Sequence, residues 1–197
     1  MLRRGALCLV RLVCLVCLVA CGHDAPATIT AAEGQRVVAF VGDHVTVGAL
    51  QLDVDGPPRS TLWERVRGKG SPGRLLLVMH EPTRRDGRYV SGHRVVKFGA
   101  HRIDLEASGT PSDPSVTFEV TPYVMGPRLS AEDARMVADE ELSPHSHGPL
   151  SCLAASPSPD GKTFFVRCSD LGAVEPDREV TVDAATGAVV SVVQKGD

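Results

Sequence analysis

The chain has 197 residues, a formal net charge of −3 and 43% hydrophobic residues. This length suits one domain or two small ones and excludes a large multidomain enzyme. The apolar content excludes wholesale disorder, and the net charge argues against a nucleic-acid partner.

The first 20 residues have the pattern of an export signal. Arg3 and Arg4 give a positive start, and an apolar run follows over residues 6–20, interrupted by Arg11. A run of about 15 residues is too short for a mature membrane-spanning helix, which needs about 20. We therefore expect residues 1–20 to be a signal peptide. Without them the chain carries 18 basic and 24 acidic residues.

The apolar run ends in Leu18-Val19-Ala20-Cys21, which Gly22 follows. This sequence resembles the lipobox of bacterial lipoproteins. The resemblance implies that Cys21 receives a diacylglycerol, becomes the first residue after cleavage and is then acylated, for instance with palmitate. One acyl chain anchors a protein only weakly, and stable anchoring takes two such signals. The diacylglycerol and the N-acyl chain together provide more than two. An uncleaved anchor, or a secreted protein with an incidental cysteine, is the alternative.

The residues after Cys21 bear on location. In such families an aspartate after the cysteine commonly marks retention at the inner membrane, and Gly22 stands there instead. The resemblance therefore implies the outer membrane, facing the periplasm or the cell surface, if the source is diderm. Residues 22–34 are small, polar and rich in Ala, so we expect 21–34 to be a lipidated tether.

Residues 35–126 show a repeated pattern of alternating strands and turns. Alternation is clear at 102–107 and 116–120, and turn residues cluster at 55–58. Short alternating strands separated by turns predict a small antiparallel β sandwich or barrel of about seven strands. The run 74–80 alternates less, so we expect it in the middle of a sheet, buried on both faces.

A faint repeat lies inside this β domain. Residues 45–54 and 96–105 both predict a strand, a Gly-Ala corner and a second strand, and they are offset by 51 positions. Duplication would explain the repeat, and so would two hairpins that share a common pattern.

A helix is predicted after the β domain. Ser130 is a suitable N-cap, Asp133 completes a capping box, and Leu129 can act as a hydrophobic staple. Ser143-Pro144 ends the helix. Its predicted apolar face consists of Ala131, Ala134, Val137, Ala138 and Leu142.

The sequence Ser158-Pro159-Asp160-Gly161-Lys162 predicts a hairpin with a three-residue loop. Pairing Ser158 with Lys162 places Cys152 opposite Cys168, at a hydrogen-bonded position of the ladder. Since export leads to an oxidising compartment, we expect a disulfide bond worth about 3 kcal/mol. Two free buried thiols are the alternative.

The C-terminal part resembles PepSY-type domains, small modules with a capped helix and a final V-D-A-x-T-G-x-V hairpin. The resemblance rests on residues 129–134, 161–166 and 182–190. It implies that Asp183 and Gly187 serve the turn, and that 127–197 is an α+β module that inhibits peptidases or regulates envelope processes. Convergence on a common β-turn would also explain the pattern. The whole chain is thus predicted to be α+β and mostly β.

No nucleophile elbow, P-loop, zinc-protease helix or dinucleotide fingerprint is present in the sequence. An envelope hydrolase would need a site on β-domain loops around His80, His93 and His101, with Asp43 or Asp104 as a partner; His44 is the fourth histidine of this domain.

His145 and His147 could bind copper or zinc in a periplasmic metal-binding protein. Two histidines between two prolines are more typical of a polar connection. We therefore expect no cofactor and no catalytic residue.

Charge is unevenly distributed. Residues 59–102 hold 11 basic and 3 acidic residues, whereas 129–197 hold 5 basic and 12 acidic. The basic segment could face anionic headgroups or an envelope polymer beside the anchor, each cation contributing about 1 kcal/mol. Alternatively, the two parts dock on each other, or the charges are solvated.

These observations favour a lipid-anchored, non-catalytic envelope protein that acts as a binding or regulatory module. Its expected partners are the membrane, through the lipid on Cys21, and an envelope protein or anionic polymer.

Overall fold

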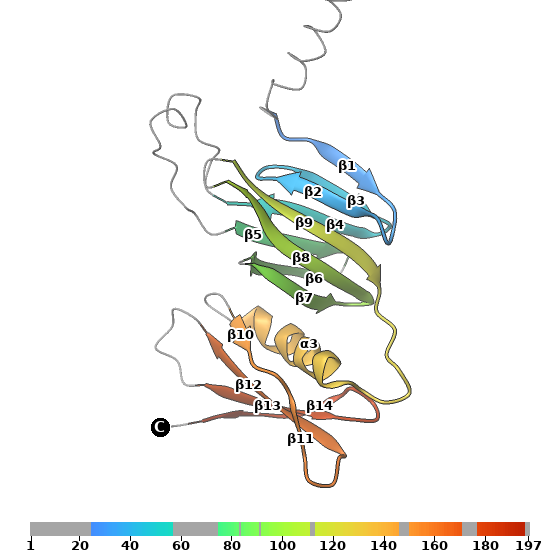
Figure 1. The fold of residues 1–197 in the computed structure, drawn as a ribbon, viewed down its shortest axis with the longest axis vertical. Coiled ribbons are helices and arrows are strands. Elements are labelled where there is room, and N and C mark those ends of the chain that lie inside the picture. Colours follow the sequence, from blue (N-terminus) through green and yellow to red (C-terminus); the bar gives the residue numbers. More distant parts are fainter. Residues whose placement is uncertain are drawn as a thin grey trace, which may run out of the picture.

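The computed structural model describes residues 25–56, 75–82, 84–90, 92–110, 113–145, 150–170 and 177–195. They form two sheets packed face to face, then a helix that lies on a third sheet (Figure 1). The fold is α+β and mostly β, as predicted. Within these ranges, no helix is both long and apolar enough to span a membrane.

The two facing sheets, here called the sandwich, contain strands β1 to β9. Sheet A has the order β1-β3-β4-β5-β6, and sheet B has the order β2-β9-β8-β7. The nine strands form two separate sheets rather than one closed barrel, so of the two predicted alternatives the structure is a sandwich. Their bounds are β1 (Thr28–Ala31), β2 (Arg36–Phe40), β3 (His44–Val47), β4 (Leu50–Asp55), β5 (Leu75–Glu81), β6 (Arg84–Val90), β7 (His93–Phe98), β8 (His101–Thr110) and β9 (Asp113–Pro122).

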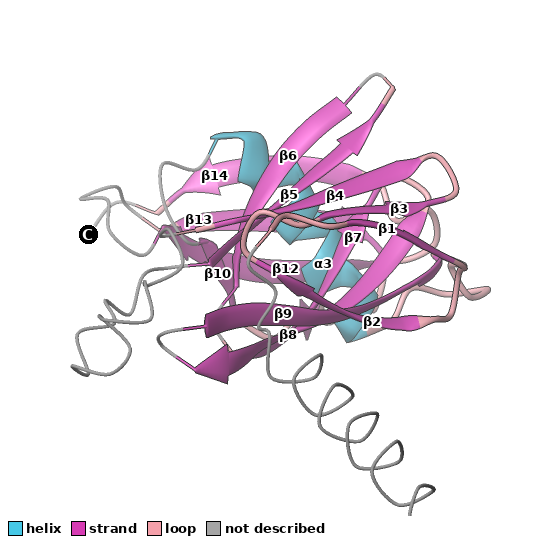
Figure 2. Ribbon diagram, turned by 90° about the horizontal axis from the view of Figure 1, so that it is seen from above, coloured by secondary structure: helices cyan, strands magenta, loops and turns pink. Residues whose placement is uncertain are grey.

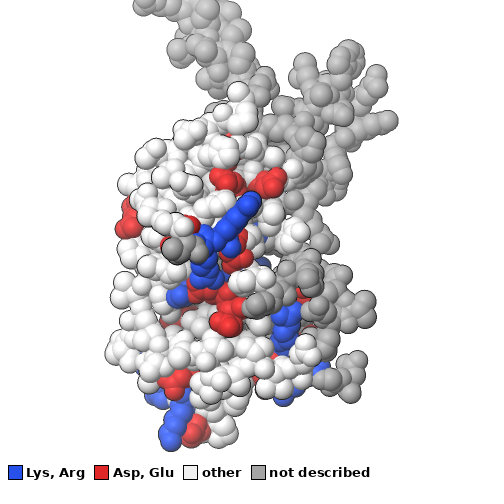
Figure 3. Space-filling model, turned by 180° about the vertical axis from the view of Figure 1, so that it is seen from behind, with Lys and Arg blue, Asp and Glu red and all other residues white. Residues whose placement is uncertain are grey.

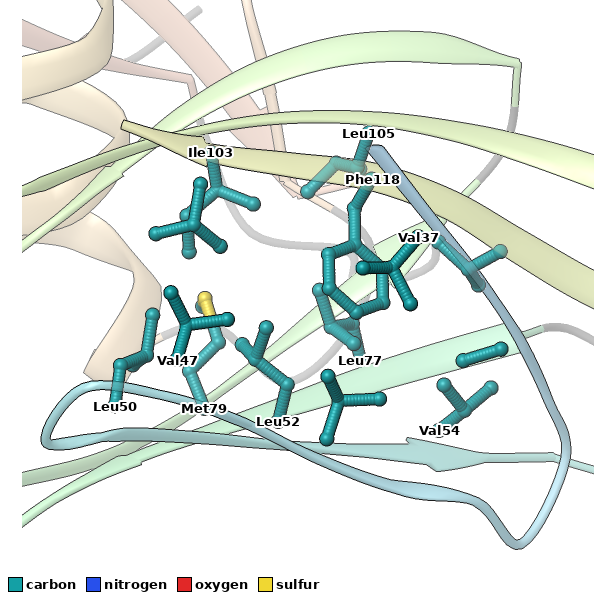
Figure 4. Packing of buried hydrophobic residues seen from close by; sticks show 14 of the residues in the cluster. Val37, Val47, Leu50, Leu52, Val54, Leu77, Met79, Ile103, Leu105 and Phe118 are labelled. Carbon is teal, nitrogen blue, oxygen red and sulfur yellow. The ribbon is translucent and has the colours of Figure 1, made fainter. Parts of the chain in front are cut away.

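Alternating side chains of both sheets fill the core of the sandwich. Figure 4 shows Leu52, Leu77, Met79, Ile103 and Phe118 meeting between the sheets, and each is at most 1% exposed. In β5, three successive residues from 77 to 79 are buried, as expected for a strand covered on both faces. β5 lies between β4 and β6, next to the edge of sheet A rather than at its centre.

Strand β1 adds one parallel pair to the otherwise antiparallel sheets of the sandwich. Thr28–Ala31 falls within the expected tether, yet it pairs in parallel with β3. Ala31 is 7% exposed and Ile29 packs against the same core. The pairing is fixed at its start by Asp43, whose carboxylate accepts the Ala27 N–H at 2.9 Å.

The two halves of the sandwich have matching topologies. The β3–β4 and β7–β8 hairpins turn at Gly48 and Gly99, with φ of 60° and 57°, as in type II′ turns. Sheet A contains the order β3-β4-β5-β6 and sheet B the order β7-β8-β9-β2. The strands β3, β4 and β5 therefore correspond to β7, β8 and β9, while β6 and β2 each join the sheet of the other half. This correspondence favours duplication over a shared hairpin pattern.

The C-terminal unit consists of one long helix and a third sheet. The sheet order is β10-β12-β13-β14, and β11 also pairs with β12. The bounds are α3 (Ala131–Leu142), η1 (Ser143–His145), β10 (Leu150–Cys152), β11 (Ser156–Pro157), β12 (Thr163–Asp170), β13 (Arg178–Asp183) and β14 (Val189–Gln194).

Helix α3 begins where the sequence predicts. The Ser130 hydroxyl accepts the Asp133 N–H at 3.1 Å. The Asp133 carboxylate in turn accepts the Ser130 N–H, which completes the capping box. Ala134, Ala138 and Leu142 are buried against the third sheet. Ala131, predicted on this face, is exposed because it lies in the first turn, beside the cap.

The structure also gives α3 a second buried face. The helix lies between the third sheet and the β6 and β7 edges of the sandwich, as Figures 1 and 2 show. Met136, Asp139 and Glu140 are buried there. The prediction missed this face because two of its three residues are acidic.

A disulfide bond joins Cys152 to Cys168 between β10 and β12. The hairpin closes at Ser158 and Thr163 rather than at Lys162, because the Ser158 N–H donates to the Thr163 carbonyl at 2.9 Å. The Leu153 N–H donates to the Arg167 carbonyl at 2.8 Å. The cysteines therefore occupy the adjacent non-hydrogen-bonded position, where strands come closest, with Cα atoms 4.0 Å apart.

Candidate functional site

Two histidines share one carboxylate on the outer face of sheet A. His44 Nδ1 lies 2.7 Å from Asp53 Oδ1, and His80 Nε2 lies 2.9 Å from Asp53 Oδ2. The register explains the contact, because His44 is directly opposite Asp53 and β5 lies on the other side of β4. Asp53 is 35% exposed at its side chain, so this pairing is largely a surface interaction.

The other two histidines of the sandwich have carboxylates of their own. His93 Nε2 lies 2.8 Å from Asp104 Oδ1 across β7 and β8. His101 Nε2 lies 3.4 Å from Glu81 Oε1, which belongs to sheet A. Gly99 is packed against this pair, since a Cβ there would lie 2.7 Å from Glu81 Oε2.

The structure therefore gives His80, His93 and His101 three different carboxylates, so they do not share one acid–base site. Asp43, predicted as a possible partner, is buried and binds backbone instead: its carboxylate accepts the Phe40 N–H at 2.8 Å. The geometry of these residues is that of separate ion pairs on the sandwich.

Among the residues that the structure describes, no group of three or more His, Cys, Asp or Glu side chains could hold a metal ion. The side chain of His145 and all of His147 lie outside the described residues. The predicted metal candidates are therefore untested.

Among the described residues, basic and acidic side chains meet between α3 and the sandwich, and Figure 3 shows them next to one another at this level. We call this set the α3 ion-pair cluster. Two acidic residues of α3, Asp139 and Glu140, each bind two cations. Glu140 Oε1 also accepts the Gly99 N–H at 2.8 Å. The cluster consists of Asp86, Asp139 and Glu140 with Arg84, Arg88, Arg94 and Lys97.

Arg88 is the most buried cation of this cluster. It is 2% exposed; its Nη1 lies 2.7 Å from Asp86 Oδ2, and its Nε lies 3.4 Å from Asp139 Oδ2. Burial lowers the pKa of Arg88, while Asp139 and Asp86 act in the opposite direction. Asp86 in turn accepts the Ser143 hydroxyl at 3.0 Å. The α3 ion-pair cluster therefore joins the sandwich to the C-terminal unit.

This cluster shows where the charges of the two parts meet in the described residues. Basic side chains from residues 84–102 bind acidic side chains of α3, so the two parts dock on each other. Residues 59–74, which hold the other cations of the basic segment, lie outside the described residues.

A cleft of about 760 Å³ adjoins the cluster. Its wall includes Arg84, Lys97, Glu140, Glu141 and Val189. Tyr123 lies nearby, with Lys97 Nζ 5.2 Å from its ring centroid. Burial, then Asp133 and Glu140, raise the pKa of Tyr123 to about 12. Glu140 in this wall already binds Arg84 and Lys97.

The face of the third sheet opposite α3 is a second candidate. We call it the C-terminal outer face: Leu153, Phe165, Arg167 and Glu179. It surrounds a shallow hollow of about 520 Å³. Leu153 is 57% exposed and Phe165 37%, while Arg167 and Glu179 are directly opposite each other on β12 and β13. Exposed apolar side chains flanked by charge are typical of a protein-binding surface.

The V-D-A-x-T-G-x-V turn has the structural role that the resemblance implies. The Asp183 carboxylate accepts the Thr186 N–H and hydroxyl, both at 2.8 Å, and the Ala185 N–H at 3.0 Å. These bonds, that of the Thr186 hydroxyl first, lower the pKa of Asp183. Gly187 has a φ of 70°, which favours glycine.

Sequence reasoning missed the pairing partners Asp139 and Glu140. Their only signal was position: the i, i+3, i+4 pattern places Met136, Asp139 and Glu140 on one face of α3, opposite Ala134 and Ala138. Acidic residues on such a face are ordinarily solvated, so the pattern alone did not indicate burial.

Residues 1–24, which include the lipobox and Cys21, lie outside the described residues. A scan against protein-family models and searches of curated proteins and of solved structures found no match to this chain.

Proposed function

We propose that this chain is a lipid-anchored, non-catalytic cell-envelope protein that acts as a binding or regulatory module. The observation that carries the proposal is the lipobox Leu18-Val19-Ala20-Cys21 directly after a charged and apolar leader. Cys21 is then the lipidated residue, and the protein faces the periplasm or the cell surface.

An anchor at Cys21 would lie close to the folded part of the chain. Strand β1 begins at Thr28, seven residues after Cys21. Seven extended residues span at most about 25 Å. A chain acylated at Cys21 would therefore hold the sandwich close to the membrane surface.

Two observations support a binding role over hydrolysis. The sandwich histidines bind separate carboxylates, and the C-terminal outer face exposes Leu153 and Phe165. A PepSY-like module would bind its target without chemistry, so the proposed partner is an envelope protein. An anionic envelope polymer is the other proposed partner, and its binding would depend on the cations of residues 59–74.

The anchor is tested by growing cells with a clickable fatty-acid analogue. The full chain should be labelled and sediment with membranes, and Cys21→Ser should lose the label. Cys17→Ser is the matched control, because it removes a leader cysteine outside the lipobox position. Persistent labelling of Cys21→Ser would refute the anchor.

The binding role is tested by placing a photo-crosslinking amino acid at Phe165 of the full chain in cells. We expect a discrete adduct with one envelope component. The same amino acid at Val38, an exposed valine of the sandwich (50%), is the control. Equal adduct patterns at both positions would contradict binding at the C-terminal outer face.

A further inference from the structure

Edge strands leave backbone N–H and C=O groups open, and most edges in the described part of the chain are protected. β6 carries four charged side chains, and β7 lies against α3, whose Arg135 donates to the Val95 carbonyl at 3.0 Å. β10 and β11 have three and two residues. β1 has four residues, and β2 begins with Arg36.

Strand β14 is different. It has six residues, four of them valine and none charged. On one side it pairs with β13, and it is the last strand of its sheet. Val190 is 61% exposed, Val192 43% and Val193 50%. A long, uncharged and apolar edge strand is an expected site for pairing with another strand.

The backbone of β14 shows which groups are open. The Lys195 N–H donates to the Asp177 carbonyl at 2.8 Å, so Lys195 and Asp177 form a hydrogen-bonded pair directly beyond the β13–β14 ladder. Because such pairs alternate along an antiparallel ladder, the backbone groups of Val192 and Gln194 point away from β13. The register shift near Val190 leaves Ser191–Gln194 regular.

We propose that β14 pairs antiparallel with the β14 of a second copy of this chain, with Val192 opposite Val192. The N–H of each Val192 then donates to the C=O of the other. This pairing is possible because the backbone groups of Val192 point away from β13. Ser191 faces Val193 of the second copy, and Val190 faces Gln194. Strand β14 itself carries no charged side chain.

The side chains fit this pairing on both faces of the sheet. Val192 is opposite the fully buried Val180, so it lies on the face that α3 covers, yet it is 43% exposed. In the dimer, the two Val192 side chains would cover each other. Val193, on the other face, would lie against Ser191 of the second copy and extend the C-terminal outer face across both chains.

The symmetry of the pairing also suits two anchored chains, an argument that rests on the proposed function. The two-fold axis of an antiparallel strand pair is perpendicular to the sheet. The third sheet, α3 and the sandwich are stacked along the long axis of the molecule, with β1 at the far end (Figure 1). The axis therefore runs along the stack, and the β1 strands of both chains lie at the same end, so that two anchors there would face one membrane.

Disulfide crosslinking of the full chain tests the dimer. Val192→Cys places two thiols at a position where the Cα atoms of paired strands are about 5.5 Å apart, within the range of a disulfide. After mild oxidation we expect most of this variant to run as a dimer on a non-reducing gel. Val38→Cys is the matched control, because Val38 is an edge-strand valine with 50% exposure and the chain has the same other cysteines.

Mass measurement in detergent gives an independent readout. Wild type and Val192→Thr should have the mass of a dimer, whereas Val192→Lys, which opposes two like charges, should be monomeric with an unchanged circular dichroism spectrum. Crosslinking of Val192→Cys no stronger than that of Val38→Cys, or a monomeric wild type, would overturn the proposal. Crosslinking of Val192→Cys that persists in a Cys21→Ser background shows that β14 pairs without the anchor. The dimer and the lipid anchor can therefore be refuted independently of each other.

Discussion

At the scale of single residues, Gly99 and Gly48 form a natural comparison. They occupy the same position in two matching hairpins, with nearly equal positive φ. At Gly48 an added Cβ would meet nothing within 4 Å, whereas at Gly99 it would lie 2.7 Å from Glu81 Oε2. The two sites therefore separate backbone strain from a steric contact.

We expect Gly48→Ala to lower the free energy of unfolding by about 1 kcal/mol, since alanine is strained at positive φ. Gly99→Ala should lose about 1 kcal/mol more, because Glu81 must move away from His101. Urea unfolding of both variants measures the difference. Equal losses would mean that Glu81 moves freely and that its contact with His101 contributes nothing.

At the scale of elements, the hairpin with the disulfide bond gives the next prediction. The bond closes a loop between residues 152 and 168, worth about 3 kcal/mol in the chain-entropy model. Adding a reductant should therefore lower the urea midpoint of the wild type. The double variant Cys152→Ala, Cys168→Ala should already be destabilised and show no response to reductant. Two reactive thiols from this pair in the denatured, unreduced chain would contradict the bond.

The same hairpin shows how a correct prediction can rest on an incomplete reason. The sequence places Cys152 opposite Cys168 by assuming a loop closed by Ser158 and Lys162. The loop closes one residue later, and the irregular residues 153–155 between β10 and β11 compensate for the shift. Turn residues predict that a hairpin exists, but the bulge depends on packing of the whole sheet.

The cap of α3 could be predicted because a capping box is a local interaction between Ser130 and Asp133. The second buried face could not, because its residues are buried only once β6 and β7 supply Arg84, Arg88, Arg94 and Lys97. Local patterns thus predicted the element, and long-range charge pairing determined what the element contacts.

At the scale of the whole molecule, the α3 ion-pair cluster determines how the sandwich and the C-terminal unit hold together. Asp139 is fully buried and faces Arg88 and Arg94. Asp139→Asn keeps the size of the side chain but leaves buried Arg88 short of a charge partner, so we expect a loss of about 3 kcal/mol. The measurement uses urea, because guanidinium chloride is a salt and would screen the ion pairs.

Glu141→Gln is the control for this prediction, because Glu141 is an exposed neighbour on the same helix. Its effect should stay within about 0.5 kcal/mol. If the two variants unfold at the same urea concentration, the cluster does not hold the units together and the docking must depend on Met136 and its apolar neighbours.

The fold class was predictable because alternation and turn residues are repeated over some 90 residues. Which sheet each strand joins was not. The charge asymmetry did indicate that the two parts could dock, and the structure supplies the residues involved. The parallel pairing of β1 had no local signal, since Thr28–Ala31 is too short for its pattern to be read.

The exchange of β2 and β6 between the two sheets has a consequence for how the chain folds. Arg36 pairs with Glu119, so sheet B gains its last strand from a segment more than 80 residues upstream. Sheet A likewise needs β6 from the second half. Neither half can complete a sheet by itself. Strand β2 therefore stays unpaired until β9 is available to pair with it. Such distant pairing slows folding, and an exported chain would present β2 unpaired to the envelope during that interval.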